Sequence, residues 1–459
     1  MHKLSAGGGA DGRSLTLQRS ICILALSPIA DDPRVCRQVE AFNSASWTVS
    51  VVGLSSRTAR RLRWPILTVD DPGVPPVWED QNEQVRLTAG RSRQIWSAAN
   101  SAKRRLIRGL RVVGLGGVAD FLHALKKRLY LGFTRLRPNF AQRVFWRYVD
   151  RAGDIYRRAL QVEALIWLAN DWAMLPVAAR LARERGGIYG YDTHEFATEE
   201  YAENWRWRLF QRPMVGAIER EYIRDAAVVS AVSSGIAERL DRLYLLPRAS
   251  LTIRNTPEYQ EVPFRPTRRD RIDVLYHGIV VANRGLEAAV DSVPLWRPEF
   301  TLTIRGPENP AFSPALRERI AALGLQDRVR LAPAVPMTDL VREAAAFDVG
   351  FFALPGHSHH NEFALPNKFF EYVMAGLALC TTDLPEMARL IRQYDLGLTI
   401  AAVEPAAIAA AINALDPERI DRFKRNALAA ARELCWERES ERLIAAYDAA
   451  LSMTRAKTV

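Results

Sequence analysis

The chain repeats one pattern of hydrophobic and polar positions: a short β-branched apolar run, a turn and an amphipathic helix. In the first half, apolar runs predict strands at 21–26, 49–54, 164–168, 188–191 and 228–232, with helices at 33–46 and 173–185. The second half restarts the pattern, with strands predicted at 273–276, 300–305, 329–331, 348–353 and 378–381, and helices at 286–293 and 366–375. Such alternation is typical of parallel sheets covered by helices on both faces.

The predicted fold class is therefore α/β, with two Rossmann-like domains that face each other across a cleft. Ligands are expected in that cleft, at the carboxyl ends of the strands of both sheets. The pattern offers no G-x-G-x-x-G after a first strand, which disfavours a dinucleotide oxidoreductase.

Composition marks the boundaries between these parts. Residues 1–18 are rich in Gly and Ser and are predicted to be a disordered leader. A Pro- and Arg-rich stretch follows Asn255-Thr256-Pro257 and predicts a linker, so we expect an N-terminal Rossmann-like domain at 19–257 and a C-terminal Rossmann-like domain at 258–430. A helix is predicted around 427–451, and the C-terminal segment 431–459 is a candidate for crossing back to the N-terminal domain.

Charge is concentrated in one segment. Between Arg86 and Arg147 the chain has fifteen Lys or Arg and a single acid, Asp120, so this segment alone exceeds the net charge of +11 of the whole chain. Large apolar residues alternate with the basic ones, a pattern typical of helices that lie on anionic lipid surfaces. The alternatives are a solvated helical insertion at 86–147 and a nucleic-acid surface, for which no recognition motif is present.

Two further features bear on the compartment. No run of about 18 apolar residues is present, so a membrane-spanning helix is not expected. The four cysteines are scattered without a C-x-x-C pair, which favours a reducing cytosol.

The segment 361–376, Asn-Glu-Phe-Ala-Leu-Pro-Asn-Lys-Phe-Phe-Glu-Tyr-Val-Met-Ala-Gly, carries the most chemical information. Pro366 suits the first turn of a helix, whose free N–H groups favour an anion such as a diphosphate. Lys368 adds a positive charge there. Glu371 lies four residues after Asn367 on the same helix face, where its carboxylate can accept hydrogen bonds from vicinal hydroxyls. The alternative is an ordinary amphipathic helix with a dipole-stabilised Glu371.

This segment resembles the donor-binding helix of the retaining GT-B glycosyltransferases of family 4, in the branch that reads L-P-N-K-x-F-E-Y. The resemblance covers roughly residues 20–450, and further matches occur in the family's order. They are Ser27-Pro28 to Asp32-Pro33-Arg34-Val35, Asn170-Asp171-Trp172, Tyr191-Asp192-Thr193-His194-Glu195, Ile253-Arg254-Asn255 and Thr382-Asp383-Leu384-Pro385-Glu386.

The resemblance implies that the domain at 19–257 binds the acceptor and that the domain at 258–430 binds the nucleotide sugar. It also implies a role for each matching residue. Glu371 would bind the ribose, and Asn367, Lys368 and the helix terminus with Leu365 and Pro366 would hold the diphosphate. His194 would lie against the donor sugar and stabilise charge near the anomeric carbon, with a surface or capping histidine as the alternative. The acceptor or cleft residues would be Ser27, Asp32, Arg34, Asp192 and Glu195.

Two departures from the family pattern stand out. The family commonly has a second Glu eight residues before the ribose-binding one, but that position is Phe363, and the nearest acid is Glu362. In the loop from Gly278 to Gly285, Arg284 stands at the position of the family's Lys, while Ile279 replaces its Arg. Lys368 is the residue placed to compensate for the missing charge.

Neither a metal nor a cofactor is expected. No D-x-D motif occurs, so a metal-bridged diphosphate is not indicated. His357, His359 and His360 crowd one loop, but their spacing is untypical of zinc, and contact with the sugar or the acceptor is the favoured interpretation.

The sequence thus predicts a retaining, metal-independent glycosyltransferase that moves a sugar from a nucleotide donor to a hydroxyl of a lipid-linked or cell-surface polysaccharide precursor. We expect it in the cytoplasm, peripherally associated with the inner face of the membrane through 86–147. Two rival interpretations are a catalytically weak GT-B protein that serves as an assembly partner and a nucleotide-sugar epimerase.

Overall fold

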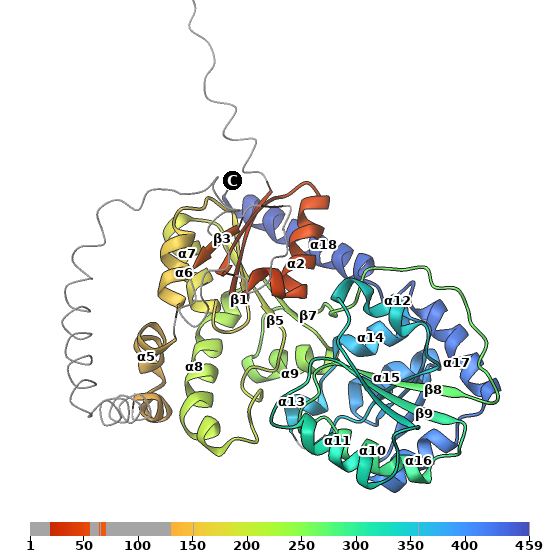
Figure 1. Cartoon of the computed structure of the whole chain (residues 1–459). Coiled ribbons are helices and arrows are strands. Elements are labelled where there is room, and N and C mark those ends of the chain that lie inside the picture. Colours follow the sequence, from red (N-terminus) through yellow and green to blue (C-terminus); the bar gives the residue numbers. More distant parts are fainter. Residues whose placement is uncertain are drawn as a thin grey trace, which may run out of the picture. The chain divides into compact units, whose positions relative to one another are not determined.

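The computed structural model describes residues 19–55, 64, 66–69, 130–149, 151–356 and 358–458. The predicted leader 1–18, part 86–129 of the predicted basic insertion, and His357 lie outside these residues. The chain divides into two compact units, Met1–Val229 and Ser230–Val459, each built from a sheet with flanking helices (Figure 1).

The first sheet has the strand order β3-β2-β1-β4-β5-β6-β7. Its strands are β1 (Ser20–Pro28), β2 (Thr48–Leu54), β3 (Ile66–Val69), β4 (Ile166–Asn170), β5 (Ile188–Thr193), β6 (Val228–Ala231) and β7 (Leu251–Thr252). β1 pairs in parallel with β2 on one side and β4 on the other. All five residues of β4 are buried, as expected for a central parallel strand covered on both faces.

Helices of the first half follow the strands. They are α2 (Pro33–Ser44), α5 (Ala141–Tyr148), α6 (Ala152–Ala159), α7 (Leu175–Arg185), α8 (Arg212–Tyr222) and α9 (Ser234–Tyr244), with the 3-10 turns η1 (Ile29–Asp31), η3 (Pro138–Phe140) and η5 (Ile223–Asp225) and the π-helix η4 (Trp207–Gln211). Asp32 caps α2, because its side chain accepts hydrogen bonds from the backbone N–H groups of Arg34 and Val35.

The second sheet has the order β10-β9-β8-β11-β12-β13 and is parallel throughout. Its strands are β8 (Ile272–His277), β9 (Phe300–Arg305), β10 (Val329–Ala332), β11 (Val349–Phe352), β12 (Ala378–Thr382) and β13 (Gly397–Ile400). The helices are α10 (Leu286–Ser292), α11 (Ser313–Ala322), α12 (Leu340–Ala344), α13 (His359–Glu362), α14 (Asn367–Met374), α15 (Pro385–Tyr394), α16 (Pro405–Asn413), α17 (Pro417–Ala430) and α18 (Trp436–Thr458), with the 3-10 turns η6 (Val293–Leu295) and η7 (Met337–Asp339).

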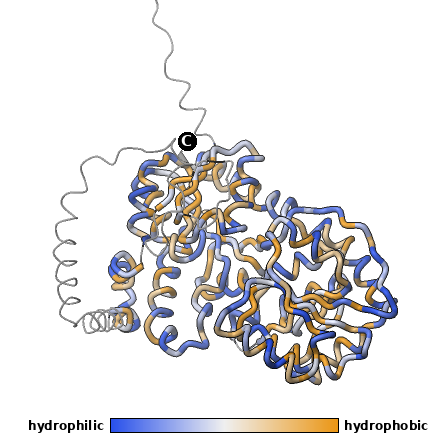
Figure 2. The backbone as a smooth tube through the Cα atoms, in the orientation of Figure 1, coloured by the Kyte–Doolittle hydropathy of each residue, from blue (hydrophilic) through white to orange (hydrophobic). Residues whose placement is uncertain are grey.

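The predicted α/β class with two parallel sheets is confirmed. In Figure 2 hydrophobic stretches run along the strands, whereas the colours alternate along the helices, which is the pattern from which both were predicted. The single helix predicted around 427–451 is two helices in the structure, because α17 ends at Ala430 and α18 begins at Trp436. At that break Leu434 and Cys435 are buried and the Trp436 N–H donates to the Pro257 carbonyl at 2.8 Å.

The first compact unit ends at Val229 and the second begins at Ser230. This boundary lies earlier in the chain than the domain boundary predicted at 257. The physical reason is the packing of α9, which belongs by sequence to the first half. Glu386 at the start of α15 accepts a hydrogen bond from the Gly235 N–H at 2.9 Å, and Ser233 Oγ donates to the Phe363 carbonyl at 3.0 Å. Residues of α9 therefore group with the second unit.

The core of the second unit includes one buried charge cluster. Asp348 is 1% exposed and accepts hydrogen bonds from the Asp273 N–H at 3.0 Å, from Arg265 at 2.8 Å and from Lys424 Nζ at 3.0 Å. Lys424 is itself buried at 2% exposure, and burial lowers its pKa. The cluster joins α17 to the ends of β8 and β11.

We predict that Asp348→Ala lowers the free energy of unfolding by about 3–5 kcal/mol, because it leaves the Lys424 ammonium buried without its carboxylate. Urea denaturation followed by tryptophan fluorescence measures the change. Asp270→Ala is the matched control, since Asp270 pairs with Arg268 at the exposed surface and should change little. Equal effects of the two substitutions would contradict a stabilising role for the cluster.

Candidate functional site

The first candidate site of the second unit is built around Lys368 on α14. Its ammonium lies 4.2 Å from the ring centroid of Tyr276 and 4.1 Å from that of Phe352. No acid in the described part of the chain forms an ion pair with it, and burial together with the nearby Arg284 lowers its pKa to about 7, which Glu371 offsets only in part. An ammonium held between two aromatic faces without a carboxylate is available to an incoming anion.

The loop after β8 approaches Lys368 closely. Gly278 has a φ of +139°, and a Cβ atom there would lie 2.6 Å from Lys368 Nζ. Gly285 has a φ of +72°, and its Cβ would lie 2.0 Å from the Ala353 carbonyl oxygen. Both positions therefore require glycine. Arg284 is exposed between them, so this loop brings a second positive charge next to Lys368.

Helix α14 begins one residue later than predicted. Pro366 is its N-cap in extended conformation and Asn367 is the first helical residue, with no side chain capping the terminus. Leu365 is 4% exposed and lies in the hydrophobic core, so its side chain does not contact a ligand. The free N–H groups at this terminus keep the predicted preference for an anion.

Glu371 lies one turn further along α14 and is held by a residue that the sequence interpretation missed. His277 Nε2 is 2.8 Å from Glu371 Oε2, and the imidazole stacks on Tyr372 with ring centroids 4.7 Å apart. Burial lowers the pKa of His277, so the ring is neutral at pH 7. Arg305 Nη2 lies 3.5 Å from Nδ1, which favours the tautomer with its hydrogen on Nε2, the ring nitrogen nearest to Glu371.

The histidine loop before α14 forms no metal centre among the residues that the structure describes. His359 Nδ1 lies 2.7 Å from Glu362 Oε2 across the single turn of α13, at the exposed surface. Glu362 is thus engaged by His359, and Phe363 occupies the position where the resembling family has its first Glu. The side chain of Phe363 packs against Arg239, whose Cζ is 4.3 Å from the ring centroid.

The candidate site of the first unit is a buried network at the ends of β4 and β5. Arg34 forms a two-point pair with Asp192, with Nε to Oδ2 and Nη2 to Oδ1 both at 2.6 Å. Gln38 donates to Asp192 at 2.7 Å and accepts from Asn170 at 3.2 Å. Arg34 and Asp192 are 1% and 0% exposed, so they are placed to position neighbours rather than to contact an acceptor directly.

The residue that this network positions is His194. Its Nε2 lies 2.9 Å from Asn170 Oδ1 and 3.5 Å from Asp192 Oδ2, and its Nδ1 lies 3.4 Å from Asp171 Oδ2. Burial lowers the pKa of His194, but the carboxylates of Asp171 and Asp192 outweigh it and the pKa rises to about 9. With both ring nitrogens facing oxygens, His194 is an imidazolium at neutral pH and not a general base.

The remaining predicted residues of the first unit have simpler surroundings. Ser27 Oγ donates to Asp32 Oδ2 at 2.7 Å, while Asp32 caps α2. Glu195 is exposed, and its carbonyl accepts from Thr193 Oγ1. These three therefore lie at the carboxyl edge of the first sheet with local structural contacts, and their acceptor role stays a prediction.

Residues 271–416 match the family model described as Glycosyl transferases group 1. This segment contains β8, the Gly278–Gly285 loop and α14, which together carry Lys368, Arg284, His277 and Glu371. Among curated proteins, no sequence matches the chain.

Solved structures of similar fold cover nearly the whole chain. The structure of Anabaena HepE in complex with UDP has a TM-score of 0.62 at 13% identity and covers 94% of this chain and 100% of its own. Sucrose-phosphate synthase from Thermosynechococcus elongatus has a TM-score of 0.61 at 16% identity and covers 95% and 100%. The lipopolysaccharide outer core galactosyltransferase WaaB has a TM-score of 0.56 at 11% identity and covers 94% and 99%.

These likenesses show a GT-B fold, and with the family match they support a glycosyltransferase of GT-B type. In the described part of the chain, no helix has the length and apolarity needed to cross a bilayer.

The surroundings of Lys368 predict a pH dependence for diphosphate binding. Its pKa of about 7 means that the ammonium is charged below pH 7 and neutral above it. A diphosphate favours the charged form, so UDP affinity should fall on the order of tenfold between pH 6.5 and 8.5. Isothermal titration calorimetry measures it, with Lys368→Arg as the control because its guanidinium stays charged. A parallel decline in both proteins would show that Lys368 is not the titrating group.

Proposed function

We propose that the protein is a retaining, metal-independent glycosyltransferase that moves a sugar from a nucleotide donor to an acceptor hydroxyl. The observation that carries the proposal is the pair of cations at the carboxyl edge of the second sheet. Lys368 and Arg284 lie near one another without a carboxylate partner among the described residues, beside the open N-terminus of α14. A leaving diphosphate is the ligand whose charge this arrangement matches.

The neutral His277 and Glu371 fit the nucleoside part of the donor. Glu371 is partly exposed, with 12% of its side chain accessible, while His277 holds one of its oxygens from the buried side. The other oxygen is then left for vicinal hydroxyls, as a ribose presents them. The structural neighbours include Anabaena HepE in complex with UDP-glucose, which supports a uridine nucleotide as the first donor to test.

In the proposed reaction, the acceptor oxygen bonds to the anomeric carbon on the face from which the diphosphate departs. The bond between that carbon and the diphosphate oxygen breaks, and the acceptor proton passes to the leaving phosphate. Lys368 and Arg284 stabilise the charge that develops on the diphosphate. The imidazolium of His194 is a fixed hydrogen-bond donor and cannot take the proton, which agrees with a reaction that needs no enzymic base.

Metal independence is part of the proposal because side chains supply the positive charge that a divalent ion would bring.

The acceptor that we propose is a lipid-linked or cell-surface polysaccharide precursor, and the proposed location is the cytoplasm, at the inner face of the membrane. All four cysteines are free and buried, which fits a reducing compartment. WaaB, one of the neighbours, is an outer core lipopolysaccharide galactosyltransferase, and this supports a surface glycan as the acceptor class.

The rival functions differ in their products. Purified protein with radiolabelled nucleotide sugars and a membrane extract should transfer label to the extract. Epimerised nucleotide sugar would favour the epimerase, and unchanged donor with every sugar would favour the assembly partner.

EDTA should leave transfer intact. Loss of transfer in EDTA that a divalent ion restores would contradict metal independence.

Replacing Lys368 or Arg284 by Ala should lower turnover by roughly 10²-fold, as for the loss of one contact to a developing oxyanion. Because both act on one leaving group, the double variant should lose less than the product of the two effects. Steady-state kinetics with saturating donor measures this. Full activity in both single variants would remove the phosphate assignment.

Glu371→Ala should weaken UDP binding by about 1.5–3 kcal/mol, because it removes charge-assisted hydrogen bonds to the ribose hydroxyls. Calorimetry with UDP and with uracil alone separates the ribose contribution, since only the former should lose affinity. Glu318→Ala is the control, because Glu318 is an exposed acid on α11. Wild-type affinity in a folded Glu371 variant would exclude the ribose role.

A further inference from the structure

Residues 130–149 form an unusually charged surface on the first unit. They contain four arginines and no acid, and Arg135, Arg137, Arg143 and Arg147 are all exposed. None of the four forms an ion pair with a described residue, whereas arginines elsewhere on the surface, such as Arg157 and Arg242, pair with acids. The surface therefore carries uncompensated positive charge.

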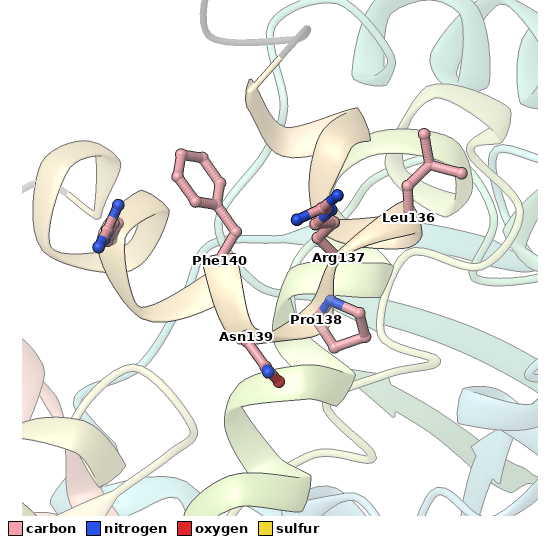
Figure 3. A pocket seen from close by; sticks show the side chains of 6 residues that line it. Leu136, Arg137, Pro138, Asn139 and Phe140 are labelled. Carbon is pink, nitrogen blue, oxygen red and sulfur yellow. The ribbon is translucent and has the colours of Figure 1, made fainter.

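Two of these arginines line an open pocket of about 440 Å³. The pocket is formed around the turn η3, and Figure 3 shows how its side chains project from the backbone. Its lining residues are Leu136, Arg137, Pro138, Asn139, Phe140 and Arg143. The guanidinium of Arg143 lies 5.9 Å from the Phe140 ring centroid. Two guanidinium forks and an amide around one hollow match the oxygens of a phosphate group.

Large apolar side chains stand beside the same pocket. Leu136 is 77% exposed and Phe133 is 46% exposed, and Phe133 meets Phe140 edge to face at 5.6 Å. Exposed apolar residues next to arginines are typical of protein surfaces that lie in the interface of a bilayer, where the apolar groups enter the acyl region and the cations meet the headgroups. A free phosphate ion or a nucleic-acid backbone would gain nothing from Leu136.

The exposed side of this surface can be altered without removing the core contacts of α5. The buried side of α5 presents Val144 and Phe145 to the core, at 1% and 0% exposure. Gln142 donates a hydrogen bond to Glu221 on α8, and α5 packs along that helix. The arginines and Leu136 face away from these contacts.

We propose that the pocket around η3 binds the phosphate headgroup of an anionic lipid and docks the first unit on a membrane surface, with Phe133 and Leu136 entering the interface. Arg137 and Arg143 hold the phosphate. The proposal does not depend on sugar transfer, because it concerns only this surface. It also narrows the predicted basic segment 86–147 to a described site, while eleven further basic residues at 86–129 lie outside the described residues.

The test uses the full chain and sedimentation with vesicles of phosphatidylcholine alone or mixed with phosphatidylglycerol. The wild-type protein should bind the mixed vesicles at low salt and should not bind the vesicles of phosphatidylcholine alone. The double variant Arg137→Glu and Arg143→Glu should lower the partition coefficient by at least about tenfold, since each basic residue at an anionic surface contributes several-fold. High salt should reduce the difference.

The matched control is the double variant Arg224→Glu and Arg330→Glu, which makes the same charge change at two exposed arginines that do not line the pocket. Equal loss in the control would overturn the pocket, because net charge alone would then explain binding. Phe133→Ser with Leu136→Ser should lower the binding that persists at high salt, and no loss there would overturn interfacial insertion. Retention on RNA that requires Arg137 and Arg143, without vesicle binding, would overturn the lipid in favour of nucleic acid.

Failure of this proposal is distinguishable from failure of the proposed function. Calorimetry with UDP should give the same affinity for wild type and for the Arg137/Arg143 variant, because neither arginine belongs to the second unit. Lost UDP affinity would mean that the variant is damaged as a whole. Arg137→Lys with Arg143→Lys then serves as a milder pair, which keeps the charge but loses the two-point geometry and should still bind less tightly than wild type.

Discussion

The unpaired ammonium of Lys368 is the constraint around which the second unit is arranged. A desolvated cation without a carboxylate costs free energy, so the fold must support it in other ways. The rings of Tyr276 and Phe352 supply attraction through their faces, and Glu371 offsets part of the cost from one turn away. An anionic ligand would supply the remaining negative charge beside Lys368. Binding of such a ligand would therefore also remove the free-energy cost of the unpaired ammonium.

Close backbone approach makes that arrangement possible. A Cβ at Gly306 would lie 1.9 Å from the Gly278 carbonyl oxygen, and a Cβ at Gly278 would meet Lys368 Nζ. The ends of β8 and β9 and the N-terminus of α14 are thus drawn together at the carboxyl edge of the sheet. The first unit solves the same problem in the opposite way. It pairs its buried charges fully, Arg34 with Asp192 and His194 with Asp171 and Asp192, and so offers a rigid, already satisfied cation.

The periodicity of the sequence was sufficient for the α/β class and for the central strands. β9 was predicted with its observed bounds, and β1, β4 and β8 within a few residues, because continuous β-branched runs leave few alternatives. Short edge strands such as β7, with two residues, have no pattern to detect. The break between α17 and α18 was missed because both flanks have helical composition. Its cause is the long-range contact of Trp436 with Pro257.

The same difference between local patterns and long-range contacts decided which residues of the candidate site the sequence predicted. Lys368 and Glu371 were predicted from the local motif at 361–376, and Arg284 from the loop between Gly278 and Gly285. His277 and Arg305 were missed because their role depends on strand register, in which they are direct partners on β8 and β9. A signal was available, since Arg305 ends the strand predicted at 300–305, His277 directly follows the strand predicted at 273–276, and parallel strands end at one edge. Asp171 lies in a segment that matches the resembling family, but the sequence predicted no role for its side chain. The structure places its Oδ2 3.4 Å from His194 Nδ1.

The departure at Phe363 has a structural explanation in this fold. Its ring would be 2.3 Å from a Cβ at Gly235 and lies over Arg239, and its carbonyl accepts from Ser233. Phe363 therefore packs against α9 within the second unit, and a glutamate there would place a second carboxylate beside Gly235 and Glu386. The phenylalanine ring at this position thus contributes to the packing of α9 in a way that a carboxylate could not. Ile279 shows the complementary case, because it is 59% exposed and its carbonyl is held by the Tyr276 hydroxyl. The backbone of the loop is fixed there by a neutral contact. Arg284 in the loop and Lys368 on α14 are therefore the positive charges of the candidate site.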